Sequence, residues 1–242
     1  MHHAKNVLIT GANKGIGYET ARQLGAMGFM ILLGTRNEEK GKEAVAALVN
    51  EGVNARFILL DVTNQDTIEA ATRQIEQEFG SLDVLINNAG VSLERGASPS
   101  QLELAVLKET FETNFFGMFA VTKAMLSLLT KSPSGRIVNL SSGLGSLAIN
   151  SDPKSEFARF NLLAYNSSKT AVNALTVMFA KEFKNSPLKI NAADPGYTAT
   201  DLNRQTGYRS VEQAAGIVVR LATLPEEGPT GGFFDENGEV PW

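Results

Sequence analysis

The sequence NVLITGANKGIG, residues 6–17, places a short apolar run directly before a turn that contains Gly11, Gly15 and Gly17. The apolar run is typical of a buried strand, and a helical pattern begins at Gly15. Because glycine has no Cβ, the backbone of such a turn can approach a ligand closely, and the unpaired N–H groups at the start of the helix favour a diphosphate. The stretch therefore predicts a strand, a nucleotide-binding turn and a helix. A tight connection without a ligand is the alternative for the turn taken alone.

The rest of the chain repeats this alternation of strand and helix. Apolar runs typical of buried strands occur at residues 7–10, 29–34, 56–60, 84–86, 136–140, 189–192 and 232–234. Helical patterns occur at residues 15–27, 38–51, 65–79, 102–130, 165–184 and 211–223. The alternation predicts an α/β fold, a doubly wound Rossmann sheet of about seven parallel strands with helices on both faces. We find no linker or repeat and expect one domain, residues 1–242.

The end of the second expected strand indicates which nucleotide the turn accepts. The glycine spacing differs from Gly-x-Gly-x-x-Gly and lacks the Gly-Lys-Ser/Thr ending of a P-loop, which disfavours ATP hydrolysis. Residues 33–37, LGTRN, contain no acidic side chain that would hold an adenine-ribose diol. Arg36 can make a forked pair with a 2′-phosphate, and Lys14 can add a point charge. The alternative is that both are solvated surface cations.

A second signature lies in residues 163–169, LAYNSSK, where Tyr165 and Lys169 are about one helical turn apart. A tyrosine titrates near ~10, so proton donation at neutral pH benefits from a cation that stabilises the phenolate. Lys169 can be that cation. The pair therefore indicates a general acid and its activating group, although an isolated Tyr-x-x-x-Lys is more often a surface tyrosine beside a solvated lysine.

These motifs, in this order, resemble the short-chain dehydrogenase/reductase family, and most closely its carbonyl-reductase-like NADPH members. The resemblance extends to further motifs: Asp61-Val62, Asn87-Asn88-Ala89-Gly90, Asn114 in TNFFG, Ser141-Ser142, and Pro195-Gly196-Tyr197-Thr198. It implies the catalytic residues Asn114, Ser142, Tyr165 and Lys169. The sequence alone does not choose between the two serines; the family's second serine is the catalytic one. The resemblance implies that NADP(H) is bound by Gly11, Asn13, Lys14, Gly15, Ile16, Gly17, Arg36, Asp61, Val62, Asn88, Ala89, Gly90, Tyr165, Lys169, Pro195, Gly196 and Thr198.

The activity that the resemblance implies is reduction of a ketone, aldehyde or quinone by NADPH, with Tyr165 as general acid. Ser142 would bind the carbonyl oxygen, Lys169 the nicotinamide ribose, and Asn114 a water that relays the replacement proton. Thr198 would bind the nicotinamide carboxamide, or else serve only as a turn residue. We expect a fairly apolar small-molecule substrate. The alternatives are a catalytically silent NADP(H)-sensing protein and a structural or interaction module.

The composition excludes several other classes. The formal net charge of -4 makes nucleic acid an improbable partner, and the absence of cysteine excludes disulfides and thiolate ligands. His2 and His3 are adjacent at the terminus, where we expect no metal site. No apolar run is long enough to cross a bilayer, and the first strand starts too early for a signal peptide, so we expect a cytoplasmic protein without membrane contacts.

Residues 150–160, NSDPKSEFARF, depart from many relatives by their added length. We expect a short helix with Asp152 as N-cap and Pro153 in its first turn, so that Phe157 and Phe160 share one face. An insertion here can cover the helices that otherwise pair subunits, which makes a monomer plausible; a plain loop extension is the alternative, and the oligomeric state stays undecided.

The last part of the chain gives three further expectations. Residues 199–209 form a mobile flap over the substrate. Phe233 and Phe234 form an edge strand, followed by a turn at residues 235–238, DENG. The final residue, Trp242, is a buried anchor rather than a wall of the substrate site.

Overall fold

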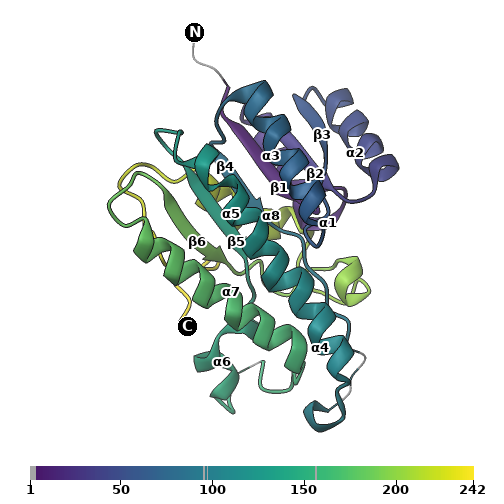
Figure 1. Ribbon diagram of the computed structural model, residues 1–242. Coiled ribbons are helices and arrows are strands. Elements are labelled where there is room, and N and C mark those ends of the chain that lie inside the picture. The colour runs from purple at the N-terminus through teal and green to yellow at the C-terminus, as the bar shows by residue number, and fades with distance from the viewer. Residues whose placement is uncertain (1–3, 95, 97, 156) are drawn as a thin grey trace.

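A computed structural model describes residues 4–94, 96, 98–155 and 157–242, and they form the expected Rossmann-type fold around one parallel sheet (Figure 1). Its strands are β1 (Asn6–Thr10), β2 (Met30–Thr35), β3 (Ala55–Leu59), β4 (Val84–Asn87), β5 (Arg136–Leu140), β6 (Lys189–Ala193) and β7 (Phe233–Phe234). Their order in the sheet is β3-β2-β1-β4-β5-β6-β7, and every adjacent pair is parallel. The prediction of an α/β sheet of about seven strands is confirmed.

Helices cover both faces of this sheet. They are α1 (Gly15–Ala26), α2 (Glu38–Asn50), α3 (Gln65–Phe79), α4 (Leu104–Phe111), α5 (Met118–Leu129), α6 (Leu147–Ser151), α7 (Leu163–Glu182) and α8 (Val211–Ala222). Val7 and Ile9 of β1 face the core that contains side chains of α1, α2 and α8, whereas Leu8 faces the core of α3 and α5. In Figure 1, α3, α5 and α7 lie in front of the sheet. Burial on both faces explains why the strands read as apolar runs rather than alternating ones.

The stretch expected as one helix at residues 102–130 is divided in the structure. Between α4 and α5, the segment η2 (Glu112–Gly117) is a π-helix, and the short 3-10 helix η1 (Pro99–Gln101) precedes α4. A Cβ placed on Gly117 would lie 2.7 Å from the carbonyl oxygen of Val62, so only glycine fits this approach. A π-helical turn inside a helix often marks a functional site, and this one contains Asn114.

The prediction of a helix that begins after Asp152 is wrong, because the helix of this region ends before that residue. The helix of this region is α6, which is N-capped by Ser146 and ends at Ser151. Asp152 instead closes a turn by accepting a hydrogen bond from the Lys154 N–H at 2.9 Å. Residues 152–161 are not helical where described, and Glu156 lies outside the described residues. The proline two residues after α6 explains why that helix does not continue.

Residues 150–160 lie against the first turn of α7, where the Asn166 side chain donates to Asn150 at 3.1 Å and to the carbonyl oxygen of Phe160 at 3.5 Å. Phe157 packs next to Gly143, and the Phe160 ring lies 6.0 Å from that of Tyr197, so both aromatic side chains face the loops after β5 and β6. Phe119 of α5 and Met178 of α7 stay exposed, at 42% and 58%. The segment leaves these two side chains uncovered, and the monomer stays a prediction.

The chain ends beside the edge strand β7. The Asp235 N–H donates to the carbonyl oxygen of Gly238 at 2.9 Å, which closes the expected turn. Trp242 stacks on Phe233, with ring centroids 5.6 Å apart, but its side chain is 39% exposed, so it anchors the terminus without being buried. Its carbonyl oxygen accepts a hydrogen bond from Ala148 at 3.0 Å, which joins the terminus to α6.

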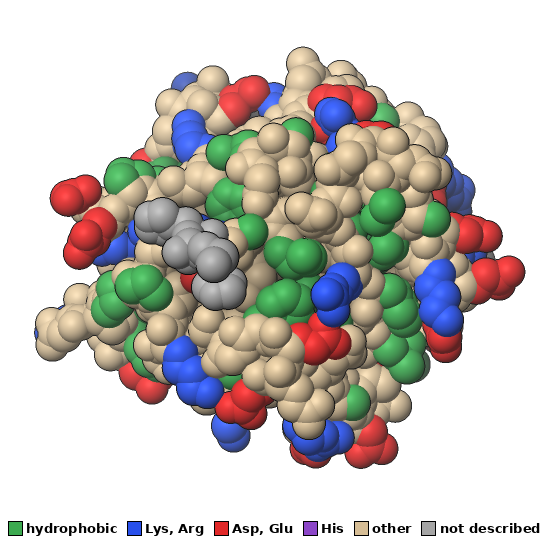
Figure 2. Space-filling model, turned by 90° about the horizontal axis from the view of Figure 1, so that it is seen from above, with side chains coloured by type: hydrophobic (Ala, Val, Ile, Leu, Met, Phe, Trp, Pro, Cys, Tyr) green, Lys and Arg blue, Asp and Glu red, His purple; other side chains and the backbone are tan. Residues whose placement is uncertain are grey.

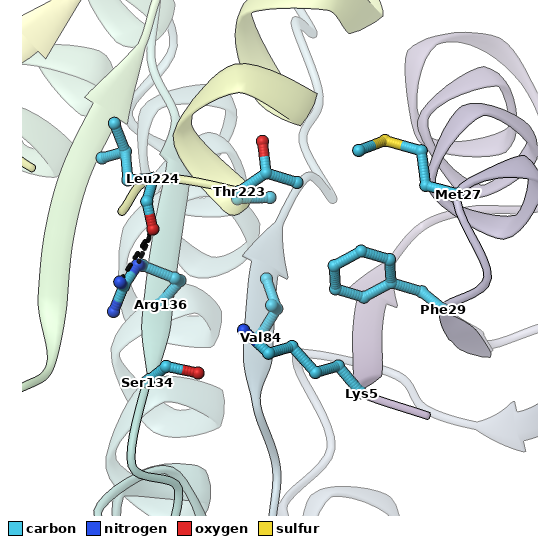
Figure 3. Close-up of a pocket in the computed structure, with 9 residues that line it drawn as sticks. Lys5, Met27, Phe29, Val84, Ser134, Arg136, Thr223 and Leu224 are labelled. Carbon is cyan, nitrogen blue, oxygen red and sulfur yellow. Dashed lines mark hydrogen bonds between the residues drawn. The ribbon is translucent and has the colours of Figure 1, made fainter. Parts of the chain in front are cut away.

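A cavity of about 300 Å³ lies at the amino ends of the strands. Figure 2 views this end of the molecule, with hydrophobic side chains near the middle and charged ones around them. The buried Arg136 beside the cavity donates to the carbonyl oxygens of Leu224, Pro225, Gly135 and Pro187, and Figure 3 shows its bonds to Leu224. Its guanidinium thus joins the segment after α8 to the start of β5. Burial lowers the pKa of Arg136.

Within the described part of the chain, no helix combines the length and apolarity that spanning a membrane requires. The same residues contain no group of three or more His, Cys, Asp or Glu side chains placed to bind a metal ion. His2 and His3 lie outside them.

Candidate active site

The glycine-rich turn connects β1 to α1 at the carboxyl ends of the strands. Gly11 has a φ of +64°, which favours glycine. A Cβ placed on Gly17 would lie 2.4 Å from the side-chain nitrogen of Asn88. That nitrogen donates to the carbonyl oxygens of Thr10 (2.8 Å) and Gly11 (3.1 Å). The turn is therefore built by two motifs together, and it presents the start of α1 to a ligand.

The residues expected at the 2′-phosphate surround this turn. Arg36 follows β2 and is exposed, and Asn13 accepts a hydrogen bond from the Thr35 hydroxyl at 3.2 Å, which ties the turn to the end of β2. Lys14 precedes α1, and its ammonium is bonded to the carboxylate of Asp201. A cofactor with a 2′-phosphate fits this donor set, because both cations are accessible and neither is buried in a structural bond.

The expected adenine contacts lie at the end of β3. Asp61 accepts hydrogen bonds from the N–H (3.0 Å) and hydroxyl (2.8 Å) of Thr63, which shapes the turn into α3. Val62 is 8% exposed. Next to the glycine-rich turn, Ala89 lies against Gly11, since a Cβ on that glycine would approach the Ala89 Cα to 3.0 Å. Asp61, Val62 and Ala89 thus lie just after the carboxyl ends of β3 and β4, and Ala89 contacts the glycine-rich turn that follows β1.

The structure separates the roles of the two adjacent serines. Ser141 is 2% exposed and donates to the side-chain oxygen of Asn173 at 2.6 Å. The hydroxyl of Ser142 accepts from the Leu144 N–H at 3.2 Å, at the start of the 3-10 helix η3 (Gly143–Gly145), and it lies near enough to Tyr165 to lower the pKa of the phenol. Of the two serines, Ser142 is the one that affects the pKa of the Tyr165 phenol.

Tyr165 and Lys169 stand on one face of α7, and the ammonium lies 5.7 Å from the centre of the tyrosine ring. Lys169 is 4% exposed and donates to the carbonyl oxygen of Leu140 at 2.7 Å, at the end of β5. Burial lowers the pKa of Lys169 to about 8. The ammonium thus remains the main form at neutral pH, held at the carboxyl edge of the sheet.

The expected acidification of the phenol is not found in the protein alone. The pKa of Tyr165 is raised to about 12, first because burial disfavours the phenolate and second because of the negative charge of Asp194. The neighbouring Ser142 hydroxyl acts in the opposite direction. Tyr165 therefore keeps its proton firmly in this state.

Asn114 is fully buried in the π-helical segment and binds two neighbouring segments. Its side-chain amide exchanges two hydrogen bonds with the main chain of Val91, at 2.8 and 2.9 Å. It also donates to the Ser168 hydroxyl at 3.0 Å. A Cβ placed on Gly90 would lie 3.4 Å from the Asn114 oxygen and 3.6 Å from the Lys169 nitrogen, so both groups flank Gly90.

The turn after β6 contains the remaining expected residues. Pro195 and Gly196 follow Asp194, whose carboxylate accepts a hydrogen bond from the Gly196 N–H at 2.9 Å. The hydroxyl of Thr198 is directed to the carbonyl oxygens of Pro195 and Gly196, so in this structure it stabilises the turn. A ligand bond from this hydroxyl requires it to rotate.

The flap, residues 199–209, is a loop closed by main-chain hydrogen bonds, with Arg209 at its end. The Ala199 N–H donates to the carbonyl oxygen of Arg209 at 2.9 Å, and the Arg209 N–H donates to Tyr197 at 3.1 Å. Within it lies η4 (Asp201–Asn203), which Asp201 begins. The guanidinium of Arg209 is bonded to the carboxylate of Glu236 in the C-terminal turn. The flap thus lies between the glycine-rich turn and the end of the chain.

Sequence reasoning missed Glu94 and Asp194. Glu94 accepts the main-chain N–H of Tyr165 at 2.9 Å, across 71 positions of sequence. Burial raises the pKa of Asp194. Asp194 also lies close enough to Tyr165 for its negative charge to raise the pKa of the phenol. Neither has a local pattern that marks it; Asp194 stands directly before Pro195-Gly196, which is the one signal that could have directed attention to it.

The fold and these side chains define a nucleotide-binding oxidoreductase. A family model described as short chain dehydrogenase matches residues 5–209, and the chain belongs to that family. It is 38% identical to a short-chain dehydrogenase of Penicillium roqueforti, over 90% of this chain and 88% of that protein. It is 32% identical to carbonyl reductase [NADPH] 1 of Rattus norvegicus, over 97% of both chains.

Solved structures agree with this assignment. The structure is similar to the NADPH-bound carbonyl reductase from chicken fatty liver, with a TM-score of 0.87, 25% identity and coverage of 99% of this chain and 100% of that one. It is also similar to salutaridine reductase from Papaver somniferum, with a TM-score of 0.81, 30% identity and coverage of 96% and 99%. The predicted family is confirmed.

Proposed function

We propose that this protein uses NADPH to reduce the carbonyl group of a ketone, aldehyde or quinone to an alcohol. One observation carries the proposal: the protonated phenol of Tyr165 lies beside the Ser142 hydroxyl and the Lys169 ammonium at the carboxyl end of β5. These are an acid, a hydrogen-bond donor and a cation, the groups that a developing alkoxide needs.

NADP(H) as the coenzyme is supported by the end of β2. The position where an acidic residue would hold a ribose diol is taken by Thr35 and Arg36, and Lys14 stands directly before α1. The rat and chicken relatives are themselves named for NADPH. We infer that the glycine-rich turn holds the diphosphate, that Asp61 and Val62 contact the adenine, and that Thr198 contacts the carboxamide.

NADPH would supply the hydride when bound. The protein would direct the Ser142 hydroxyl at the substrate oxygen, where negative charge grows, and Tyr165 would pass its proton to that oxygen. The raised pKa of Tyr165 keeps the phenol protonated, as a reduction requires. The Lys169 ammonium would then stabilise the phenolate that is left.

Asn114 and Lys169 offer a route for the replacement proton. Both flank Gly90, and the Asn114 oxygen, which accepts one bond from Val91, has a second lone pair. A water held between the Asn114 oxygen and the Lys169 ammonium would connect the phenolate side to solvent. This deepens the role expected for Asn114, whose amide nitrogen is already occupied by structural bonds.

The substrate side is rich in aromatic rings. Phe157 lies beside Gly143, next to Ser142, and from Phe160 the rings continue to Tyr197 and Tyr208, each 6.0 Å from the one before. Such rings favour an apolar, ring-containing carbonyl compound.

A cytoplasmic location belongs to the same proposal, because a chain without cysteine is compatible with a reducing compartment.

The proposal is tested by following NADPH absorbance with aromatic aldehydes, cyclic ketones, diketones and quinones, with NADH in parallel. Turnover of at least one class with NADPH is expected. Tight NADPH binding without turnover across the whole panel would overturn the proposal and favour the catalytically silent NADP(H)-sensing protein.

A further inference from the structure

The first turn of α7 carries Tyr165 but has no cap from its own sequence. The residue before the helix is Leu162, whose side chain makes no capping hydrogen bond. Tyr165 is the third residue of the helix, and its N–H is among those that no carbonyl of the helix can accept. The cap comes instead from Glu94, whose carboxylate accepts the Tyr165 N–H at 2.9 Å.

Glu94 stands at the end of a short segment, Val91 to Glu94, which follows β4 and which we call the strap. At its first residue, the strap is fixed by the two hydrogen bonds between Val91 and the buried Asn114 side chain. At its last residue it binds α7 through Glu94. The strap therefore connects the π-helical segment to the helix that carries the proposed acid.

The main chain of Tyr165 is held at its other end as well. The Ser168 hydroxyl donates to the carbonyl oxygen of Tyr165 at 2.7 Å and accepts from the Asn114 amide at 3.0 Å. Both main-chain polar groups of Tyr165 thus lead back to Asn114, one through the strap and the other through Ser168. An acid that must meet a substrate oxygen within hydrogen-bond distance benefits from such double fixation.

We propose that Glu94 is a positioning residue for the reaction: it fixes the start of α7 from a distant loop, so that the phenol of Tyr165 is held in place for proton transfer. The inference rests on the proposed function for its kinetic consequence. The required property is an acceptor oxygen at the end of a side chain of this length. Glutamine has that oxygen, aspartate is one methylene too short, and alanine lacks it.

The kinetic test compares Glu94→Gln, Glu94→Asp and Glu94→Ala. With Ala and Asp, we expect kcat to fall about tenfold, with KM and the Kd for NADPH within about twofold of wild type, because the binding sites are intact and only the acid is misplaced. Gln should retain at least half of the wild-type kcat. The matched control is Glu103→Ala, since Glu103 is an exposed residue before α4 that makes no capping bond.

Three results would overturn the proposal. One is a Gln variant as impaired as Ala, which would mean that the charge of Glu94 acts directly. Another is an unchanged kcat in Ala with only a lower Tm, which would mean that the cap serves stability alone. The third is an Ala variant that matches Glu103→Ala in kcat, Tm and KM.

A readout without turnover separates this inference from the proposed function. Hydrogen exchange of the Tyr165 amide measures the cap directly, since an uncapped N–H in a first helical turn exchanges quickly. We expect exchange at least tenfold faster in Glu94→Ala than in wild type or Glu94→Gln. Equal exchange in all three proteins would show that Glu94 does not cap α7, whether or not the protein reduces carbonyls.

Discussion

Lys14 and Asp201 join the glycine-rich turn to the flap: the lysine ammonium lies 2.5 Å from the carboxylate, across 187 positions of sequence. Asp201 is therefore paired with a lysine that we expect to bind the 2′-phosphate of NADPH. Its negative charge lies close to where that phosphate would bind. Lys14 and Asp201 are 64% and 61% exposed, so solvent weakens the pair.

The first prediction concerns Asp201→Asn. Removal of the carboxylate should tighten NADPH binding by about two- to threefold, because the phosphate no longer competes for Lys14, and the difference should shrink in high salt. Fluorescence titration gives the Kd. NADH serves as the control, since it lacks the phosphate; an equal gain for NADH would contradict this account of the pair.

Arg36→Ala should remove a charge-assisted contact with the same phosphate. Such contacts contribute roughly 1.5–3 kcal/mol, so the preference for NADPH over NADH should fall about ten- to hundredfold. The ratio of kcat/KM for the two coenzymes measures it. A wild-type enzyme that already prefers NADH would show that Arg36 at the end of β2 does not select the coenzyme with a 2′-phosphate.

Tyr165→Phe should abolish most turnover and leave the Kd for NADPH nearly unchanged, because only the proton donor is lost. A fall in kcat of at least a hundredfold is expected from single-turnover measurements. Tyr18→Phe is the matched control, since Tyr18 of α1 packs against the hydrophobic core and is none of the residues assigned to the substrate or the coenzyme. Comparable activity of the two variants would remove Tyr165 from the mechanism.

Gly90→Ala should fold normally and still impair the reaction. The added methyl group would meet the Asn114 oxygen and the Lys169 nitrogen at 3.4 and 3.6 Å, which are ordinary contact distances. It would, however, take the space where we place the proton-relaying water and the coenzyme ribose. We expect a Tm within a few degrees of wild type and a clear loss of kcat/KM; full activity would mean that this space is not used.

The pKa values of two buried groups predict how stability changes with pH. Burial lowers the pKa of Lys169 from 10.5 to about 8, so between those pH values the unfolded chain binds more protons and the free energy of unfolding rises with pH. The pKa of Tyr165 is raised from 10.0 to about 12, so between pH 10 and 12 the free energy of unfolding falls. Urea titrations should show the rise disappear in Lys169→Met and the fall disappear in Tyr165→Phe.

Local patterns were sufficient to predict the sheet and the nucleotide-binding turn. The apolar run of β1 followed by Gly11 predicts both, because burial on two faces and close backbone approach leave direct traces in the sequence. The predicted helix at residues 150–160 was wrong because Asp152 and Pro153 fit a helix start and a turn equally well, and only Ser146 upstream decides between them.

The parts of the site that escaped prediction are long-range. Glu94 gains its meaning from an N–H 71 residues away, and Asp194 from a phenol on another element. The expected effect of Lys169 on the phenol was also wrong for the protein alone, because the degree of burial, which dominates both pKa values, is a tertiary property. Ser141 and Ser142 are equivalent in sequence and differ only through what each faces.

The bond between Arg209 and Glu236 couples the C-terminal turn to the flap that we expect to lie over the substrate. We therefore expect an affinity tag fused after Trp242, or a shortened tail, to change the position of the flap. Recombinant enzyme tagged at this end should be compared with untagged material before any substrate profile is accepted.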